Sequence, residues 1–329
     1  MYHVLQPQAF TNSAQQFRVM TYNVLAETYA IGYSRYKYAK VPDNVIDWQY
    51  RFGVLKEHFT KSDADIICLQ EIEEPSFKNE FSTFFKELGY SGIMQEKKTI
   101  GNAIFYRDSK FKLRFTNSRS RVLLAAFTPL NSSEQEHEKN DTVAPLYICN
   151  AHLDGNPQKP HERFNQIKSL FAQLKKEETQ GNFSIKEAII CGDFNCDHKS
   201  GIYELLTSGA LSKDFRNPVT PDLPYTKEDF EIEANTGISL EFKSAYASLN
   251  NSSEPEFTFA APNMRRDPLD FIFFTPATLK VLAVSDPMLM INKNQVENEG
   301  IPNDLIPSDH LPMAAVFEFV AQEKQQEKK

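Results

Sequence analysis

The chain has 329 residues, of which 41% are hydrophobic and 24% are charged, a composition typical of a globular protein. The apolar runs are all shorter than the roughly 18–20 residues that a membrane-spanning helix needs, so no membrane partner is expected. The net charge of −8 argues against a protein that grips a long duplex through its phosphates, because such proteins are usually basic.

The N-terminal residues and the cysteines bear on the cellular compartment. Residues 1–16 contain no Lys or Arg and no long apolar run, so no secretory or mitochondrial signal is expected there. The cysteines fall mostly inside predicted strands, which suits reduced thiols; they are Cys68, Cys149, Cys191 and Cys196. We therefore predict a cytoplasmic protein, with a nuclear location left open.

Apolar periodicity predicts the elements of the N-terminal half in chain order. After a loose lead-in, they are a strand over 17–24, a surface loop over 26–47, a helix over 48–60 capped by Asp47, a strand over 64–69, a helix over 76–88 capped by Ser76, and strands from 89, over 101–106 and over 122–127. Strands and helices alternate in this half.

The C-terminal half starts with the same alternation and ends in strands. The predicted elements are strands over 143–152 and 188–193, helices over 160–178 and 201–208, and closing strands over 257–260, 269–274, 279–284 and 313–320. Residues 131–141 are polar and acidic and predict a mobile loop, and residues 212–254 predict long loops with a helix near 242–247. This order favours a single α/β domain with mixed sheets.

Polar residues able to bind a metal or a phosphate stand at the ends of six predicted strands. They are Asn23, Gln70-Glu71, His152, Asp193-Phe194-Asn195, Asp270 and Ser308-Asp309-His310. Each one alone is more simply a turn residue, a surface carboxylate or a structural histidine. Their joint occurrence is hard to explain by packing, because buried carboxylates are costly unless they are paired or bound to a cation.

The residue types select among the possible chemistries. Oxygen ligands without a cluster of thiolates favour Mg²⁺, with Mn²⁺ as a substitute, over zinc. Cys191 and Cys196 lack a partner motif with zinc-ligand spacing. The sequence also contains no G-x-S-x-G nucleophile motif, P-loop or G-x-G-x-x-G motif. The pattern therefore points to metal-assisted hydrolysis at phosphorus.

In this order the segments resemble the endonuclease/exonuclease/phosphatase superfamily of Mg²⁺-dependent phosphoesterases. The matching motifs are TYNVL (21–25), LQEIEE (69–74), GNAIFY (101–106), NAHL (150–153), CGDFN (191–195), LDFIF (269–273) and PSDHLP (307–312). The chain looks most like the branch of deadenylases, nocturnin and Angel, through DWQYRF (47–52) and IPNDLIPSDH (301–310). No leucine-rich repeat precedes the motifs, so the docking module of the large deadenylases is not expected.

The resemblance implies a fold and a domain arrangement. The expected fold is an α/β four-layer sandwich of two mixed β-sheets flanked by helices, the DNase-I-like architecture. The expected organisation is a flexible lead-in over 1–16, one catalytic domain over 17–320 and a charged tail over 321–329.

It also implies roles for the polar strand ends. Glu71 would be the principal Mg²⁺ ligand, with Asn23 and Asp309 completing the metal site. Asp193 would take a proton from the attacking water, and Asn195 would hold that water or a phosphate oxygen. His310 and His152 would donate hydrogen bonds to phosphate oxygens, and Asp270 would orient His310.

Residues that contact substrate are less clearly marked. Asn102, and Arg163 on the helix after His152, are possible contacts whose simpler explanation is packing or a helix surface. Aromatic residues near the rim, such as Phe259, would stack on bases, because single-stranded nucleotides are read by stacking and edge contacts. The simpler role of Phe259 is in a strand core.

The main functional hypothesis is a 3′-exoribonuclease of the deadenylase type that acts on single-stranded RNA such as poly(A). An alternative is the same chemistry on a nucleotide phosphate or on an RNA 2′,3′-cyclic phosphate. An inactive RNA-binding adaptor is a hypothesis from another class, and it predicts the loss of a site residue, which is not seen. An abasic-site endonuclease is disfavoured by the acidic charge.

Overall fold

The computed structural model describes residues 15–119, 121–130, 144–181, 185–211, 240–262, 264 and 266–320. The tail over 321–329, most of the lead-in over 1–16, the loop predicted over 131–141 and residues 212–239 of the predicted loop region lie outside these residues. The domain boundaries at 17 and 320 stay predictions. None of the described helices is long and apolar enough to cross a membrane.

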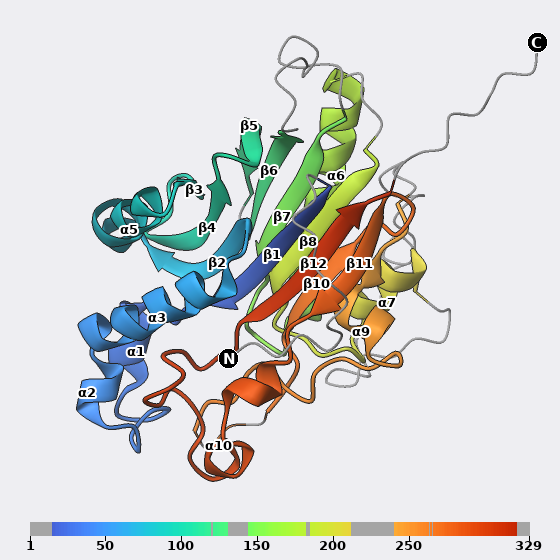
Figure 1. The fold of residues 1–329 in the computed structure, drawn as a ribbon. Helices are drawn as coiled ribbons and strands as arrows, with labels where there is room; N and C mark the ends of the chain where they lie inside the picture. The colour runs from blue at the N-terminus through green and yellow to red at the C-terminus, as the bar shows by residue number, and fades with distance from the viewer. Residues whose placement is uncertain are drawn as a thin grey trace, which may run out of the picture.

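Two six-stranded mixed sheets form the centre of the molecule (Figure 1). The first has the order β11-β12-β1-β2-β4-β3 and the second the order β5-β6-β7-β8-β10-β9. The first sheet contains β1 (Gln16–Asn23), β2 (Ile66–Glu73), β3 (Tyr90–Met94), β4 (Ile100–Arg107), β11 (Leu279–Val284) and β12 (Met313–Phe319). The second contains β5 (Phe111–Ser118), β6 (Val122–Pro129), β7 (Leu146–His152), β8 (Glu187–Asp193), β9 (Lys243–Ser244) and β10 (Asp270–Phe274).

The strand directions gather polar ends at one edge of the sandwich. β1 runs parallel to β2, with Asn23 opposite Gln70, and β7 runs parallel to β8, with His152 opposite Asp193. β10 is antiparallel to β8, so its first residue, Asp270, also lies opposite Asp193. The remaining pairs are antiparallel.

The two sheets pack face to face through apolar side chains and are also joined by one buried polar pair. Val19, Cys68 and Ile272 are among the buried residues between the sheets. Near the strand ends, Nε2 of Gln70 donates to Oδ1 of Asn150 over 2.7 Å. The amide nitrogen of Asn150 then donates to the backbone carbonyls of Leu69 and Ala103. These donated hydrogen bonds tie one sheet to the other at a fixed register, although Oε1 of Gln70 is buried without a hydrogen-bond partner.

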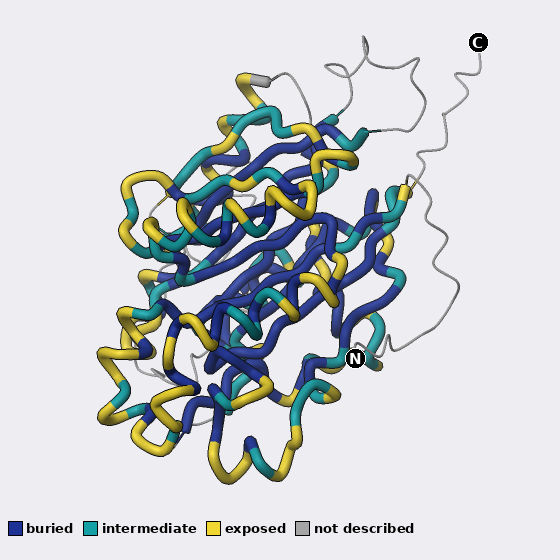
Figure 2. The backbone as a smooth tube through the Cα atoms, turned by 60° about the vertical axis from the view of Figure 1, so that its left-hand side comes forward, coloured by how far each residue is buried: buried dark blue, intermediate teal, exposed yellow. Residues whose placement is uncertain are grey.

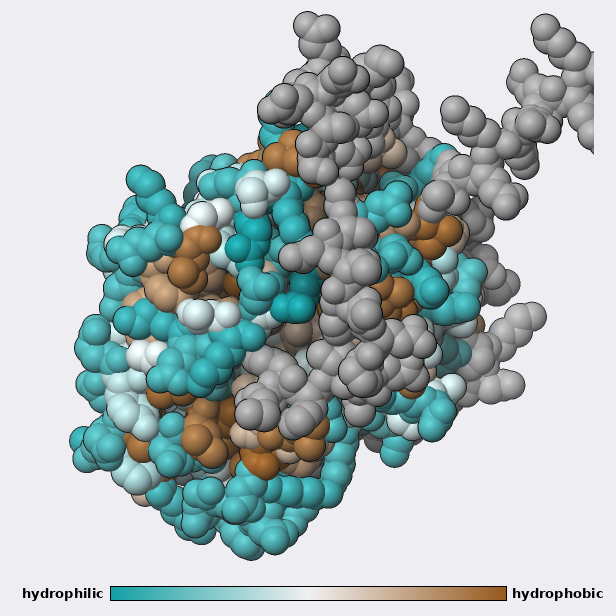
Figure 3. Space-filling view, viewed as in Figure 1, coloured by the Kyte–Doolittle hydropathy of each residue, from teal (hydrophilic) through white to brown (hydrophobic). Residues whose placement is uncertain are grey.

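Helices cover the outer face of each sheet and give the predicted four layers, so the fold class is confirmed (Figure 1). The helices are α1 (Glu27–Tyr33), α2 (Asp43–Ile46), α3 (Trp48–Ser62), α4 (Glu74–Ser76), α5 (Ser82–Glu87), α6 (Pro160–Gly181), α7 (Gly201–Ser208), α9 (Ala245–Leu249) and α10 (Lys293–Glu299). The strands are buried in the interior, and exposed residues gather in the helices and loops (Figure 2). On the face in Figure 3, separate hydrophobic patches lie among hydrophilic residues.

Helix α3 illustrates how the sequence determines an outer layer. Asp47 accepts a hydrogen bond from the Tyr50 amide, as expected of an N-cap. The predicted apolar face, which includes Trp48 and Phe52, is buried against β1 and β2. The helix continues two residues beyond the predicted end and stops at Asp63, which has left-handed backbone dihedrals.

Three predicted elements differ from the structure. The loop predicted over 26–47 contains helices α1 and α2, which pack through few buried residues and so lack a clear apolar period. The helix predicted from Ser76 begins at Glu74, has a π-helical turn over Phe77–Phe81 and has no side-chain cap at Ser76. The strand predicted over 257–260 is reduced to isolated bridges from Phe259 to Asp267 and His310.

Candidate active site

Three side chains from both sheets meet at the polar edge of the sandwich. Nδ2 of Asn23, at the end of β1, lies 3.2 Å from Oε1 of Glu71 and 3.1 Å from Oδ2 of Asp193. Oδ1 of Asn23 accepts a hydrogen bond from the Leu25 amide, and this bond orients the side chain. Two carboxylates therefore share one neutral amide donor at the junction of the sheets.

Glu71 is presented by an irregular backbone. The pairing of β2 with β4 shifts register between Leu69 and Ile72, and Glu71 within this bulge has a φ of +60°. Its Oε2 accepts a hydrogen bond from the backbone amide of Ala26, which immediately precedes α1. A non-glycine residue held at positive φ costs free energy, and such residues are concentrated at functional sites.

Asp193 depends on the glycine that precedes it. Gly192 has a φ of +137°, and a Cβ atom there would lie 1.9 Å from the carbonyl oxygen of Ala151 on β7. Only glycine therefore permits β7 and β8 to approach this closely where His152 and Asp193 project. Gly192 of the CGDFN motif thus allows the Asp193 carboxylate of the same motif to reach the site.

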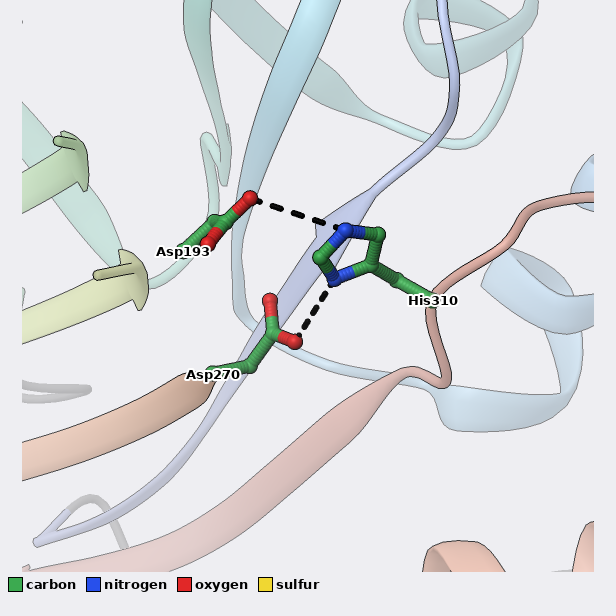
Figure 4. A group of neighbouring side chains, drawn as sticks. All are labelled: Asp193, Asp270 and His310. Atoms are coloured by element: carbon green, nitrogen blue, oxygen red, sulfur yellow. Dashed lines mark hydrogen bonds and ion pairs between the residues drawn. The ribbon is translucent and has the colours of Figure 1, made fainter. Parts of the chain in front are cut away.

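A buried histidine lies between two carboxylates (Figure 4). Nδ1 of His310 is 2.8 Å from Oδ2 of Asp270, and Nε2 is 3.6 Å from Oδ2 of Asp193. Thr258 donates its hydroxyl proton to the same Asp270 oxygen over 2.6 Å. Burial disfavours the imidazolium, but the two carboxylates outweigh this effect and raise the pKa of His310 to about 10.

His152 and Asn195 border the same cluster. Nε2 of His152 lies 3.7 Å from Oδ2 of Asp193 and 3.9 Å from Oε1 of Glu71. The Asn195 amide donates to Oδ1 of Asp193, and Nδ2 of Asn195 donates to the carbonyl of Leu153. The structure therefore brings seven of the predicted residues into one hydrogen-bonded or ion-paired group: Asn23, Glu71, His152, Asp193, Asn195, Asp270 and His310.

Asp309 has different contacts from those expected of a metal ligand. Its Oδ2 lies 2.6 Å from Nζ of Lys37 and accepts a 2.7 Å hydrogen bond from the hydroxyl of Tyr38. Burial alone would raise the pKa of this carboxyl, but the positive charge of Lys37 beside it holds the pKa below its ordinary value. The contacts of Asp309 favour an anchor for the segment after β1.

The predicted substrate contacts lie close to the cluster but have structural partners. Nδ2 of Asn102 donates to the backbone carbonyls of Arg121 and Asn150. Arg163 is buried and donates to two carbonyls of the loop after His152. The ring of Phe259 is 8% exposed, and its centroid lies 5.1 Å from that of His310. Phe259 thus packs beside His310 of the candidate site.

The donor set fits a divalent cation held by Glu71, with Asp193 as the neighbouring carboxylate. Two carboxylates that share one amide repel each other, and a hard cation bound at Glu71 would offset that repulsion. The ligand atoms of Asp193, Asp270 and His310 also lie within 4.8 Å of one another. A metal there would have to break the 2.8 Å bond between His310 and Asp270, so the Glu71 side fits better.

Sequence reasoning missed several residues that support the site. Arg51 is fully buried on α3, and its guanidinium donates to the carbonyls of Val24, Leu25 and Pro307, which flank Asn23 and Ser308. The helical period places Arg51 beside Trp48 and Phe52 on the apolar face, and this signal could have identified it. The contacts of Lys37 and Tyr38 with Asp309 join residues far apart in sequence and left no local signal.

The chain is similar to known proteins over most of its length. The family model described as "Endonuclease/Exonuclease/phosphatase family" matches residues 20–310. The Ccr4 3′-5′-exoribonuclease subunit of the CCR4-Not complex from Saccharomyces cerevisiae is 29% identical to this chain, with 92% of the chain and 39% of the yeast protein covered. CCR4-NOT transcription complex subunit 6-like-B of Xenopus laevis is 27% identical, with 92% and 64% covered. The chain thus spans less than two thirds of these relatives.

Solved structures with the same fold include two with similar coverage. ANGEL2, described as a 2′,3′-cyclic phosphatase and solved with adenosine-2′,3′-vanadate, superposes with a TM-score of 0.70 at 23% identity, covering 92% of this chain and 96% of that one. The human nocturnin catalytic domain with bound sulfate gives a TM-score of 0.64 at 22% identity, covering 94% and 95%. At this identity the likeness bears on the fold.

Proposed function

The chain belongs to the endonuclease/exonuclease/phosphatase family, and we propose that it is a Mg²⁺-dependent 3′-exoribonuclease that shortens poly(A)-like single-stranded RNA. The resemblance drawn from the motifs is confirmed for the family, and the relatives fit its branch of deadenylases, nocturnin and Angel. The description of the yeast relative as a 3′-5′-exoribonuclease supports the proposed type of reaction. The poly(A)-like substrate is our own proposal.

One observation carries the proposal. Asp193 lies opposite both His152 and Asp270 in the strand register, and its Oδ2 is 3.1 Å from Asn23 and 3.6 Å from His310. The Asp193 carboxylate therefore lies between Glu71, the proposed metal ligand, and the cationic His310. An arrangement of this kind offers a base and positive charge to a phosphorus centre from two sides.

Each side chain then has a role in hydrolysis. Asp193 accepts a proton from a water molecule as the water oxygen attacks the terminal phosphodiester in line. His310 and His152 donate hydrogen bonds to the non-bridging oxygens, and Asn195 orients the water. The bond between phosphorus and the 3′-oxygen of the preceding nucleotide breaks, and that oxygen takes up a proton from solvent to become the 3′-hydroxyl of the shortened RNA. A nucleoside 5′-phosphate is released, and Asp193 returns its proton to solvent.

Glu71 and Asn23 would hold the cation. Asn23 presents Nδ2 to both carboxylates here, so its side chain would have to turn to offer Oδ1 to a metal. When bound, Mg²⁺ neutralises charge that develops on the phosphate oxygens. Asp309, expected from the sequence to be a third ligand, is instead paired with Lys37 and Tyr38.

The test uses a 5′-labelled oligoadenylate, an oligomer ending in 2′,3′-cyclic phosphate, and NADPH, each with Mg²⁺ and with EDTA. Wild type is compared with Glu71→Ala and His310→Ala, and Glu74→Ala serves as a matched surface control. We expect a ladder of shortened oligoadenylate that EDTA abolishes and that each site variant reduces by roughly 10³-fold or more.

The other outcomes separate the alternatives. Opening of the 2′,3′-cyclic phosphate, or release of phosphate from NADPH, without shortening of oligoadenylate would contradict the exonuclease proposal. The same site would then belong to a cyclic phosphodiesterase or a phosphatase. If neither wild type nor the variants act on any of the substrates, the enzymatic proposal is contradicted and the hypothesis of an RNA-binding adaptor is favoured. A cytoplasmic location stays a prediction.

A further inference from the structure

The segment between β1 and α3 has an unusual composition for this chain. Residues 28–42, here called the tyrosine segment, contain Tyr29, Tyr33, Tyr36 and Tyr38 together with Arg35, Lys37 and Lys40. They contain no Asp or Glu, although the chain as a whole has a net charge of −8. The segment is thus locally cationic and aromatic within an acidic protein.

Both ends of the tyrosine segment are tied to the active site. Two residues before its start, the amide of Ala26 donates to Oε2 of Glu71 over 3.0 Å. Near its end, Lys37 and Tyr38 contact the carboxylate of Asp309, which precedes His310. The segment therefore extends from the proposed metal ligand to the loop of the catalytic histidine, and α1 and that loop lie on the same side of the molecule in Figure 1.

The buried side chains of this segment account for its packing. Ala30 and Tyr38 are buried in a small cluster with Phe259 and Ala261, and Nζ of Lys37 lies 4.8 Å from the centroid of the Phe259 ring. These contacts hold the segment beside the ring that neighbours His310. The other tyrosines are not needed for this packing.

Three tyrosine rings are left exposed along the segment. Tyr29 is 37% exposed, Tyr33 is 51% exposed and Tyr36 is 81% exposed. The ring centroids of Tyr29 and Tyr33 are 6.3 Å apart, as expected for neighbours one helical turn apart. The backbone amide of Tyr29 donates to the carbonyl of Ala26, whose own amide donates to Glu71, so Tyr29 stands at the Glu71 end of the row. A row of aromatic rings thus leads from the site to solvent.

We propose that the tyrosine segment binds the single strand as it extends away from the site on the 5′ side of the scissile phosphate, with Tyr33 and Tyr36 stacking on bases and Arg35 and Lys40 contacting phosphates. Aromatic rings interleaved with cations are the means by which proteins bind single strands without reading sequence. The proposal rests on the proposed RNA substrate. A peptide partner is disfavoured because the row begins at the catalytic group.

The experiment compares oligoadenylates of three and twelve nucleotides in two assays. Cleavage gives kcat and KM with Mg²⁺, and fluorescence anisotropy gives the Kd in EDTA. The Tyr33→Ala/Tyr36→Ala variant is expected to raise KM and Kd for the 12-mer roughly 10-fold or more, with kcat unchanged and a much smaller effect on the 3-mer. Tyr33→Phe/Tyr36→Phe, which keeps the rings, is expected to behave as wild type.

The cations are tested by salt dependence. Arg35→Ala/Lys40→Ala is expected to weaken 12-mer binding and reduce its dependence on salt. Lys86→Ala/Lys280→Ala, which removes two exposed lysines from α5 and β11, is the charge-matched control and is expected to leave the salt dependence close to that of wild type.

The outcomes distinguish this inference from the proposed function. If wild type cleaves both oligomers and the alanine variant is indistinguishable from it, the tyrosine segment is not the binding surface and the function stands. If wild type cleaves nothing but binds the 12-mer in a tyrosine-dependent way, the function fails and the surface stands. Absence of any binding by wild type overturns the inference.

Discussion

Nδ1 of His310 lies 2.8 Å from Oδ2 of Asp270, and this contact leaves Nε2 of the ring directed at Asp193. Because the three residues come from β10, β8 and the loop before β12, the pair orients the histidine only when both core sheets are assembled. A carboxylate in this position fixes the tautomer and favours the imidazolium.

The first prediction concerns Asp270→Asn. Asp270 and Asp193 raise the pKa of His310 to about 10 against the opposing effect of burial, so His310 is cationic at neutral pH. Removing one carboxylate lowers this pKa, and the imidazolium is then lost at lower pH. We expect kcat to fall roughly 10²-fold or more and the alkaline limb of the pH–rate profile to shift to lower pH. An unchanged profile would show that Asp270 does not act through His310; Asp286→Asn is the control.

The second prediction concerns metal-linked stability. Glu71 and Asp193 share one amide donor, so Glu71→Gln relieves their repulsion and is expected to leave the Tm in EDTA equal to or above that of wild type. If the proposed site binds Mg²⁺, the ion at ten times its Kd is expected to stabilise wild type by about 1.4 kcal/mol, and the variant is expected to lose that gain. Thermal unfolding with and without Mg²⁺ measures both effects. An equal Mg²⁺-induced rise in Tm in Glu71→Gln and in the control Glu74→Gln would place the cation elsewhere.

The polar strand ends were predictable because apolar runs in the sequence mark where buried strands stop. Parallel neighbours bring their ends to one edge, so the sequence pattern is enough to predict His152 beside Asp193, as the register shows. Asp270 reaches the same edge because it is the first residue of a strand that runs antiparallel to β8. Local pattern and sheet geometry were sufficient for this part of the site, while the roles of its residues remain proposals.

The supports of the site were not predictable by the same means. Asp309 was proposed as a ligand, but its contacts with Lys37 and Tyr38 come from a segment more than 250 positions earlier in the chain. That segment was predicted as a loop because α1 buries only Ala30 and so shows no apolar period. Such contacts depend on tertiary packing, which the spacing of single residues does not encode.

The third prediction concerns Arg51. Its guanidinium donates to carbonyls on both sides of the site, at Leu25 over 2.8 Å and at Pro307 over 3.3 Å. Arg51→Met keeps much of the volume but leaves these carbonyls without their donor, and we expect a loss of about 3 kcal/mol in the free energy of unfolding. Urea denaturation measures this loss, and Lys56→Met on the same helix is the control. A variant as stable as wild type would show that water replaces the guanidinium.

The last prediction concerns stability in mild acid and rests on His58. This residue of α3 is 7% exposed, its ring lies beside that of Tyr22, and its Nε2 lies 3.0 Å from the carbonyl oxygen of Leu305. Burial lowers its pKa from an ordinary value of 6.5 to about 4. Between these two values the unfolded chain binds a proton that the folded protein excludes, so the free energy of unfolding falls as the pH drops.

From this group alone we expect a loss of about 2 kcal/mol between pH 7.5 and pH 5. His58→Gln keeps a side-chain amide donor for Leu305 and does not titrate, so the variant is expected to lose about 2 kcal/mol less than wild type over the same interval. Urea denaturation at the two pH values measures the difference, and the remaining titratable groups cancel in the comparison. Parallel losses in both proteins would mean that His58 is protonated without cost in the folded state and that the loop at Leu305 opens to admit the charge.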